Sequence, residues 1–367
     1  MDHCPQSPEE LAAALADAAE KRQSIHLRGN GTKNGMAGPV AAADVTISTS
    51  RMTRVLQYEP RDLTISVEAG LPWHQFDTLL AAHGQMVPLD PAFWDDATVG
   101  GVVAANISGP RRRLYGSARD VVIGMTFATL EGKLVQTGGM VVKNVAGLDM
   151  AKLMIGSFGT LAAIAVVNFK LHPRPAATRT FVQEFVRATE TIAARDKILK
   201  SPLPPAAIDI MKSSHGYDLV VQAGGSPAVL DRYTRDLTGF RVLDEEQELI
   251  LWRNIREFTS DFLRDHPGGA VLRVSCLLSE VGAVLESLPA PAVARAGSGV
   301  CYGYFSEVKD LRRPEIGANV VEFAPQNYRE SAELWAAPGT DFAMMKKVKS
   351  MFDPQGLLNR GRMYGRI

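Results

Sequence analysis

The feature that most restricts the fold of this 367-residue chain is a glycine-rich segment near its N-terminus. The segment HLRGNGTKNGMAGP begins at His26 and carries Gly29, Gly31, Gly35 and Gly38. Glycine allows positive φ and lets backbone N–H groups approach a ligand, and a phosphate is the usual ligand of such amides. The segment therefore predicts a loop that binds a phosphate group, and a loose turn is the alternative.

The two common phosphate-binding motifs do not fit this context. A dinucleotide fingerprint needs a strand, then GxGxxG, then a helix, whereas Gly35, Gly38 and Pro39 exclude a helix after this loop. A P-loop needs a Lys-Ser/Thr pair that opens a helix, and here Lys33 is followed by Asn34. Another arrangement of the chain must complete the site.

Two further segments of the first half are rich in small residues. TVGGVVAANISGPRRRLYGSARDVVIG begins at Thr98, and its first nine residues predict a small-residue helix that can lie very close to a flat group. GGMVVKNVAGLDMAKLMIGSFGTL ends at Leu161. It predicts a helix over about 149–155, followed by a strand that runs to Leu171.

The residue pattern of the sequence changes after residue 171, where prolines become frequent. Prolines cluster at positions 173, 175, 202, 204 and 205, and the residues beyond alternate strand and helix patterns in the order β-α-β-β-α-β. This order is typical of an α+β layer with an antiparallel sheet. We expect one domain over 1–176, a second over 177–325, and a C-terminal segment over 326–367 that returns to the first.

Composition excludes several classes of function. Lys+Arg and Asp+Glu are both 40, so the balanced charge gives no reason to expect a nucleic-acid partner. The three cysteines, Cys4, Cys276 and Cys301, form no CxxC, so we expect no iron–sulfur cluster, metal site or disulfide. The acidic N-terminus is no signal peptide, and the apolar run over 161–167 is too short to span a bilayer. We expect a cytoplasmic protein, with peripheral attachment to the membrane's inner face through partner subunits as an option.

Taken in order, the two small-residue segments and the terminal FDPQGLLNRGRMY resemble FAD-binding proteins of the vanillyl-alcohol-oxidase, or p-cresol methylhydroxylase, type. Within that family they resemble the FAD-binding E subunits of glycolate oxidase. The resemblance implies a two-lobed FAD-binding domain followed by an α+β cap domain with an antiparallel sheet. It also implies that the glycine loop binds the FAD diphosphate through backbone amides.

The resemblance assigns cofactor contacts residue by residue. Members that attach flavin covalently carry His in this loop or Cys in the second segment, and residues 29–38 contain neither. We therefore expect non-covalent FAD, with solvent exposure as the alternative for the Lys33 side chain. The residues expected to bind FAD are Arg28, Gly29, Asn30, Gly31, Thr32, Lys33, Thr98, Gly100, Gly101, Ser108, Gly109, Tyr115, Gly116, Gly159 and Ile164.

The catalytic base is not evident. The resemblance would place a His motif of the kind HxGDGN in the later part of related catalytic subunits, and this chain lacks it. Lys143 either stabilises reduced flavin or pairs with Asp149. The basic run over 111–113 is either a solvated loop, a partner contact or a charge near the phosphates. The catalytic candidates are Lys143, Asn359, Arg362 and Arg273, followed by His215 and Arg256.

The resemblance implies that the chain oxidises glycolate, or a short 2-hydroxy acid such as D-lactate, to the 2-oxo acid with hydride transfer to flavin. Because the chain lacks cysteines for its own cluster, electrons would leave through an iron–sulfur partner, beside a second flavoprotein subunit. Two alternatives remain: a non-catalytic FAD-binding relay or scaffold subunit of such a complex, and a stand-alone FAD oxidase of another alcohol.

Overall fold

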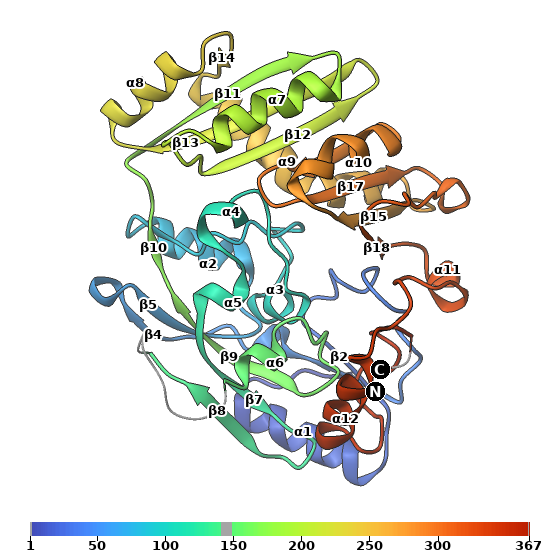
Figure 1. Ribbon diagram of the computed structural model, residues 1–367. Coiled ribbons are helices and arrows are strands. Elements are labelled where there is room, and N and C mark those ends of the chain that lie inside the picture. Colours follow the sequence, from blue (N-terminus) through green and yellow to red (C-terminus); the bar gives the residue numbers. More distant parts are fainter. Residues whose placement is uncertain (1, 141–148, 366) are drawn as a thin grey trace.

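Four sheets organise the chain in the computed structural model, which describes residues 2–140, 149–365 and 367. An eight-stranded sheet with its helices occupies the upper part of Figure 1, and the smaller sheets lie below it. We call residues 2–173 the N-terminal region and residues 177–323 the large-sheet region. Lys143, a catalytic candidate, lies outside the described residues.

The N-terminal region contains a parallel three-stranded sheet, a two-stranded ribbon and an antiparallel five-stranded sheet. Their orders are β1-β3-β2, β10-β6 and β4-β5-β9-β7-β8. The strands are β1 (Asp2–His3), β2 (Ile25–Arg28), β3 (Val45–Ser48), β4 (Val55–Glu59), β5 (Thr64–Glu68), β6 (Gln85–Met86), β7 (Val122–Ala128), β8 (Leu134–Gly138), β9 (Ala163–Lys170) and β10 (His172–Pro173). The helices are α1 (Pro8–Glu20), α2 (Trp73–Ala81), α3 (Val99–Ala105), α4 (Arg112–Tyr115), α5 (Ala118–Val121) and α6 (Ala151–Met154).

Local sequence explains these elements well. The Ser7 hydroxyl accepts a hydrogen bond from the Glu10 amide and caps α1, whose apolar residues recur at helical spacing and face the core. Strand β9 is central in its sheet, and its apolar run is buried along nearly its whole length. The Thr98 hydroxyl caps α3 by accepting from the Gly101 amide at 3.2 Å.

The large-sheet region is an eight-stranded antiparallel sheet of order β14-β11-β13-β12-β16-β17-β15-β18. Helices α7, α8 and α10 cover one face and share its apolar core. Its strands are β11 (Ala177–Phe185), β12 (Ala207–Ser213), β13 (Gly216–Gly225), β14 (Arg241–Val242), β15 (Ala270–Ser275), β16 (Ala292–Arg295), β17 (Val300–Phe305) and β18 (Ala318–Phe323). Its helices are α7 (Ala188–Leu199), α8 (Pro227–Asp236), α9 (Glu245–Asp265) and α10 (Val281–Ser287).

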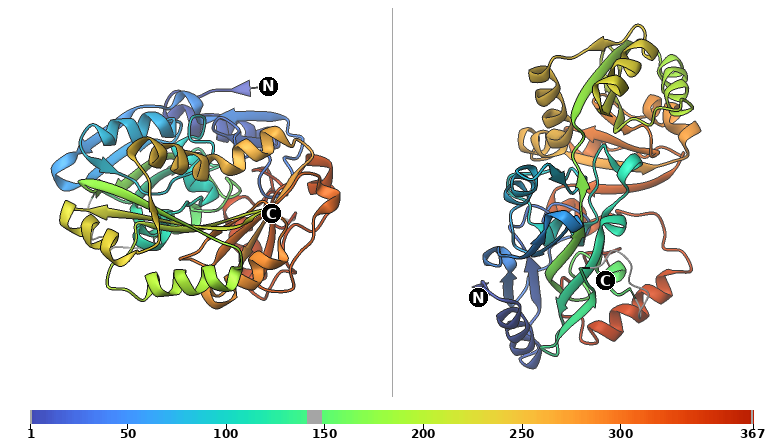
Figure 2. Two further views of the ribbon diagram at one scale, coloured as in Figure 1. Left: turned by 90° about the horizontal axis from the view of Figure 1, so that it is seen from above. Right: turned by 90° about the vertical axis from the view of Figure 1, so that its left-hand side faces the viewer.

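The other face of the large sheet looks toward the N-terminal region. There, Phe323 and Tyr304 of the sheet and Phe262 of α9 form a buried cluster with Met36 and Ala105 of the N-terminal region. Figure 2 shows that the two regions stack in this way when the molecule is turned. The sites described below lie in and beside this interface.

The C-terminal residues return to the N-terminal region after α11 (Gln326–Ser331) and α12 (Phe342–Phe352). Leu357 and Leu358 are buried in the core of the parallel sheet, and Leu358 forms a parallel bridge with Ile25. Both chain ends lie in the lower part of the molecule as drawn in Figure 1, with the N-terminal region. The expected mixture of helices with antiparallel sheets is confirmed, whereas α6 is shorter than the expected helix over 149–155.

Candidate functional site

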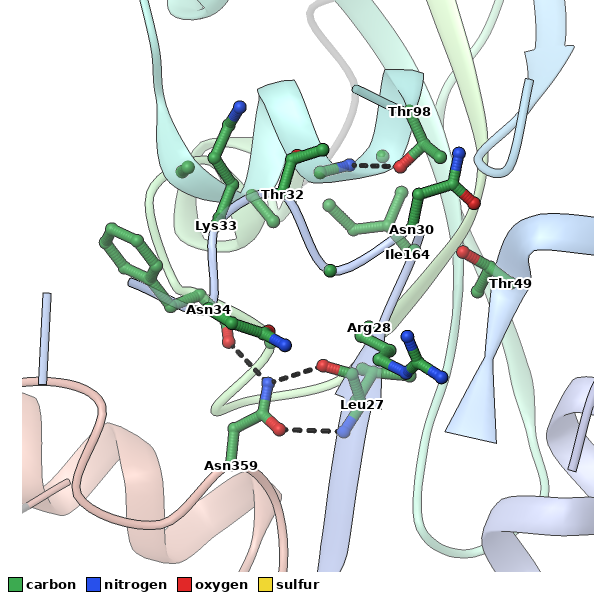
Figure 3. A pocket seen from close by; sticks show the side chains of 18 of the residues that line it. Leu27, Arg28, Asn30, Thr32, Lys33, Asn34, Thr49, Thr98, Ile164 and Asn359 are labelled. Atoms are coloured by element: carbon green, nitrogen blue, oxygen red, sulfur yellow. Dashed lines mark hydrogen bonds between the residues drawn. The ribbon is translucent and has the colours of Figure 1, made fainter. Parts of the chain in front are cut away.

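The glycine loop opens onto a pocket of about 720 Å³, which we call the glycine pocket (Figure 3). The loop follows β2, and the N-terminus of α3, the connection before β9 and the C-terminal residues supply the other walls. Its lining residues are His26, Leu27, Arg28, Gly29, Asn30, Gly31, Thr32, Lys33, Asn34, Thr49, Thr98, Gly100, Gly101, Ala104, Ala105, Phe158, Gly159, Ala162, Ile164, Asn359 and Arg362.

Glycine is required where the loop passes α3. A Cβ on Gly29 would lie 2.2 Å from the Thr98 hydroxyl oxygen, and Gly31 has a left-handed φ of +79°. The backbone N–H groups of Asn30, Gly31, Thr32 and Lys33 meet no acceptor among the described residues. Several neighbouring amide donors without partners are what a diphosphate requires, so these residues fit the phosphates of a dinucleotide.

Side chains near the C-terminal end hydrogen-bond to backbone groups of the loop and hold it in place. The Asn359 side chain accepts from the Leu27 amide at 2.7 Å and donates to the carbonyls of Leu27 and Phe158. The Arg362 guanidinium donates to the Lys33 carbonyl at 2.8 Å and the Gly38 carbonyl at 2.7 Å. Burial lowers the pKa of Arg362 to about 10. Both side chains are engaged by backbone groups, so they position the loop.

The Lys33 side chain is buried, so the alternative that it is exposed to solvent is wrong. Its ammonium donates to the Ala92 carbonyl at 3.2 Å and lies 4.4 Å from the ring centroid of Phe93. Burial lowers the pKa of this lysine to about 7, against the opposing effects of Glu257 and Glu322. Figure 3 shows the side chain extending away from Asn359.

A second space of about 1270 Å³ lies between the two regions, and we call it the arginine cavity. Its walls come from the loop before α3, from the end of α3, and from the face of strands β15, β16, β17 and β18 that looks toward the N-terminal region. Its lining residues are Met36, Ala37, Asp90, Ala92, Phe93, Ala105, Asn106, Ile107, Ser108, Gly109, Arg112, Gly156, Phe158, Arg256, Thr259, Arg273, Arg295, Val300, Tyr302, Val320, Glu322, Phe323 and Trp335.

Charged side chains from the large sheet form one wall of this cavity. The Arg273 Nε lies 3.6 Å from a Glu322 carboxylate oxygen, and Arg295 is ion-paired with the buried Asp209. The Nε atoms of both arginines are buried and make no hydrogen bond in the described part of the chain. Burial raises the pKa of Tyr302 to about 12, so its hydroxyl stays protonated at neutral pH. The wall offers donors to an anion.

Beside the cavity, contacts of α9 join the two regions. The Glu257 carboxylate of α9 accepts from the Phe93 amide at 2.9 Å and the Trp94 amide at 3.2 Å. The Arg256 guanidinium lies 4.7 Å from the Trp94 ring centroid and pairs with Glu257 at 3.0 Å. Glu257 therefore binds α9 to the loop that carries the Lys33 contacts.

The structure brings most of the expected cofactor residues together. Ser108 and Gly109 line the arginine cavity instead. Tyr115 faces a separate groove with its ring 5.3 Å from that of His172, and Gly116 packs against Asp120. The residues in the glycine pocket are Arg28, Gly29, Asn30, Gly31, Thr32, Lys33, Thr98, Gly100, Gly101, Gly159 and Ile164.

The catalytic candidates separate in space. Arg273 and Arg256 line the arginine cavity, whereas His215 is exposed at the turn between β12 and β13. In the basic run, Arg111 pairs with Asp90, and Arg113 donates to the Gly297 carbonyl of the large-sheet region at 3.0 Å. The described Asp149 pairs with Lys152 at 3.8 Å.

Sequence reasoning missed the cavity wall formed by Arg295, Tyr302 and Glu322. It also missed Thr49 and Asn34 in the glycine pocket. One signal was present: Arg273, Arg295 and Glu322 each place a single charge in a mostly apolar strand. Such a charge is costly unless it is paired or functional.

Known proteins identify this fold and its cofactor. Residues 3–138 match the family model of an FAD binding domain. The chain is 28% identical over 358 residues to glycolate oxidase subunit GlcE of Escherichia coli, with 97% of each chain covered. It is 22% identical over 415 residues to glycolate oxidase subunit GlcD of Bacillus subtilis, covering 99% of this chain and 88% of that one.

A solved structure of alkyldihydroxyacetonephosphate synthase has the same fold, with a TM-score of 0.68 at 19% identity. The match covers 98% of this chain and 75% of that one. Among the described residues, no helix combines the length and apolar character needed to cross a bilayer. The sequence matches indicate that residues 3–138 form an FAD-binding domain and that the chain is an FAD-linked oxidoreductase with FAD as its cofactor.

Proposed function

We propose that the glycine pocket binds the FAD diphosphate non-covalently and that the arginine cavity binds a short 2-hydroxy acid for oxidation to the 2-oxo acid. The unpartnered amides of Asn30 to Lys33 support the first assignment. Residues 29–38 contain neither His nor Cys for covalent attachment. We also propose 1–176 as the FAD-binding domain, 177–325 as the cap domain, and 326–367 as a segment returning to the first.

The observation that carries the substrate proposal is the cationic wall beside the cofactor pocket. Arg273 and Arg295 present buried Nε–H groups without hydrogen-bond partners in the described chain, and a carboxylate is the natural acceptor for such donors. Arg112 adds positive charge, and among the described residues its guanidinium reaches only the Ser108 hydroxyl, at 3.5 Å. Aromatic residues Phe93, Phe158 and Phe323 line the same space and limit water access.

The chain's residues bind and orient the acid while bound FAD supplies the hydride acceptor. Arginines that hold the carboxylate fix the orientation of C2 relative to the aromatic wall. Orientation of this kind contributes substantially to rate because the reacting groups no longer have to find each other.

We further propose that the chain works as a subunit of a glycolate oxidase complex. Two relatives are named as glycolate oxidase subunits. The cysteines Cys4, Cys276 and Cys301 are too few for an iron–sulfur cluster of the four-cysteine kind, so electrons would pass to an iron–sulfur partner, beside a second flavoprotein subunit. The complex would act in the cytoplasm, at the inner face of the membrane through those partners.

One observation favours a second function, an FAD-binding relay or scaffold subunit without its own substrate. Arg295 and Arg273 already have acidic neighbours in Asp209 and Glu322, and no histidine is among the described residues lining the cavity. A cavity whose charges are internally balanced does not need an anion to be stable.

Anaerobic mixing of the FAD-loaded protein with glycolate or D-lactate separates these functions. Bleaching of the oxidised flavin absorption band is expected for an oxidoreductase with its own substrate. If the flavin stays oxidised with both acids, the relay or scaffold function holds. Co-purification of a cysteine-rich partner is expected for the complex and contradicts a stand-alone FAD oxidase of another alcohol.

A further inference from the structure

Glu322 lines the arginine cavity at a point where the pairing of the sheet is irregular. In the pairing of β15 with β18, Val271 faces Phe323 and Leu272 faces Val321, so Glu322 is the extra residue of a β-bulge. Bulges redirect a side chain and are frequent beside active sites. The Glu322 backbone carbonyl accepts from the Ala37 amide at 2.9 Å, which fixes this point to the segment after the glycine loop.

The Glu322 carboxylate is sheltered and has unused acceptor capacity. Its side chain is 15% exposed and lines the arginine cavity. Its nearest ionic partner is the Arg273 Nε at 3.6 Å, and no hydrogen-bond donor of the described residues reaches its oxygens. A carboxylate in this state can accept a proton or hydrogen bond from a molecule that enters the cavity.

The other acids near the cavity are already engaged. Asp90, the second acid lining the cavity in the described chain, is bonded by Arg111. Glu257 accepts from two backbone amides and from the Ser260 hydroxyl at 2.6 Å. Asp209 is ion-paired with Arg295 through one oxygen; its other oxygen has no partner in the described chain, but Asp209 does not line the cavity. Of the acids that line the cavity in the described chain, Glu322 is thus the one whose oxygens remain available.

The charges facing Glu322 come from three elements. Arg273 lies on β15, Arg295 ends β16, and Lys33 belongs to the glycine loop. Burial raises the pKa of the Glu322 carboxyl, while these cations lower it. A carboxylate with a raised pKa is a stronger base than an ordinary one and remains ionised above that pKa.

We propose that Glu322 is the residue that accepts the hydroxyl proton of the 2-hydroxy acid, an inference that rests on the proposed function. The substrate O–H bond breaks and its proton passes to a Glu322 carboxylate oxygen. The electron pair left on oxygen forms the C=O bond, and the C2–H bond breaks with its electron pair leaving as hydride for the FAD acceptor. The substrate loses two electrons, the cofactor gains them, and Glu322 carries one proton to release afterwards.

Glu322→Gln in the FAD-loaded protein tests this assignment, because the amide keeps the size of the side chain and cannot take the proton. The rate of anaerobic flavin reduction by glycolate should fall by about 100-fold or more, the usual range for loss of a general base. Glu322→Asp should recover part of that rate. In the wild type the rate should rise with pH through the raised pKa of Glu322, and the glutamine variant should lose this rise.

A binding measurement supplies a readout independent of turnover. Titration calorimetry of oxamate, a carboxylate that cannot be oxidised in this way, in buffers of different ionisation enthalpy reports protons taken up on binding. The wild type should take up protons because a second negative charge raises the pKa of Glu322 further. Glu322→Gln should take up fewer, and Lys33, whose pKa is about 7, is the remaining acceptor. Glu307→Gln, an exposed glutamate paired with Lys309, is the matched control and should behave as the wild type in both measurements.

The results separate this inference from the function on which it rests. If no 2-hydroxy acid reduces the wild-type flavin, the proposed oxidation fails and the proton acceptor fails with it. If the wild type is reduced and Glu322→Gln keeps its rate and its proton uptake, the assignment of Glu322 alone is overturned.

Discussion

The glycine pocket and the arginine cavity are neighbours, yet they are built from different parts of the chain. The glycine pocket presents backbone amides of one short loop, braced by Asn359 and Arg362 through carbonyl groups. The arginine cavity presents side chains of four separate strands, each held by an acidic or aromatic neighbour. A Cβ at Gly29 of the first site would clash with Thr98, whereas the charges of the second site are paired with one another.

This difference indicates which kind of substitution should disturb each site. A backbone site depends on the absence of side chains, so a single added methyl group disturbs it. A side-chain site depends on paired charges, so removal of one partner leaves the other buried and uncompensated. The two sites should therefore fail separately, and the following experiments test that separation.

The largest effect is expected from Arg273→Met. Loss of the guanidinium removes a carboxylate donor and leaves Glu322 without its nearest cation. Flavin reduction by glycolate should become about 100-fold slower at low substrate, while the Kd for FAD changes by less than about threefold. Rapid-mixing absorbance and FAD fluorescence titration check the two parts.

The matched control is Arg232→Met, which removes an exposed arginine paired with Asp236 on α8 and should change neither quantity. A joint loss of FAD affinity and reduction in Arg273→Met would contradict the independence of the two sites.

Gly29→Ala should have a smaller effect, and it should change the affinity for FAD rather than the binding of the acid. The new Cβ would lie 2.2 Å from the Thr98 oxygen that caps α3, so the loop or the cap must move. Affinity for FAD should fall about 10- to 100-fold, since overpacking costs about 1–3 kcal/mol. Fluorescence titration measures it.

Gly268→Ala is the comparison for this variant, because a Cβ there meets nothing within 4 Å. Equal FAD affinities in the two variants would show that the close approach of the loop to α3 is not needed for binding.

The third effect is on stability and concerns Lys33, which belongs to the glycine pocket by sequence while its ammonium contacts Ala92, a residue of the cavity wall. Its pKa falls from 10.5 when unfolded to about 7 when folded, so between these values the unfolded chain binds more protons. The free energy of unfolding of the FAD-free protein should therefore rise with pH in this window, by up to about 1.4 kcal/mol per pH unit.

Lys33→Met should flatten this rise and should be more stable than the wild type at pH values near the folded pKa and below. Urea unfolding at several pH values measures the difference. An identical slope in both proteins would mean that the lysine keeps an ordinary pKa in the folded state.

Much of the glycine pocket could be predicted because its key residues are contiguous. Gly29, Gly31 and Thr32 lie in one segment, and the cap at Thr98 lies in a second whose composition was equally informative. The role of Asn359 was not predictable, since its partners Leu27 and Phe158 are separated from it by most of the chain. An asparagine near a chain end has no local pattern that reveals such contacts.

The arginine cavity was predicted only through Arg273 and Arg256. Ser108 and Gly109, expected to contact the cofactor, line this cavity rather than the glycine pocket, and their contact with FAD stays a prediction. Glu322 escaped notice because a bulge, which the strand pattern does not encode, decides which way its side chain points.

The sequence alone predicted a backbone-lined loop for a phosphate, an α+β chain with antiparallel sheets, and a resemblance to FAD-binding proteins. These properties depend on glycine conformation and on the local periodicity of apolar residues. Only the tertiary structure decided that Arg273, Arg295 and Glu322 face one cavity and that Lys33 is buried beside it. Their proximity arises from strand order and interface packing, which bring distant residues together and which no short stretch of sequence contains.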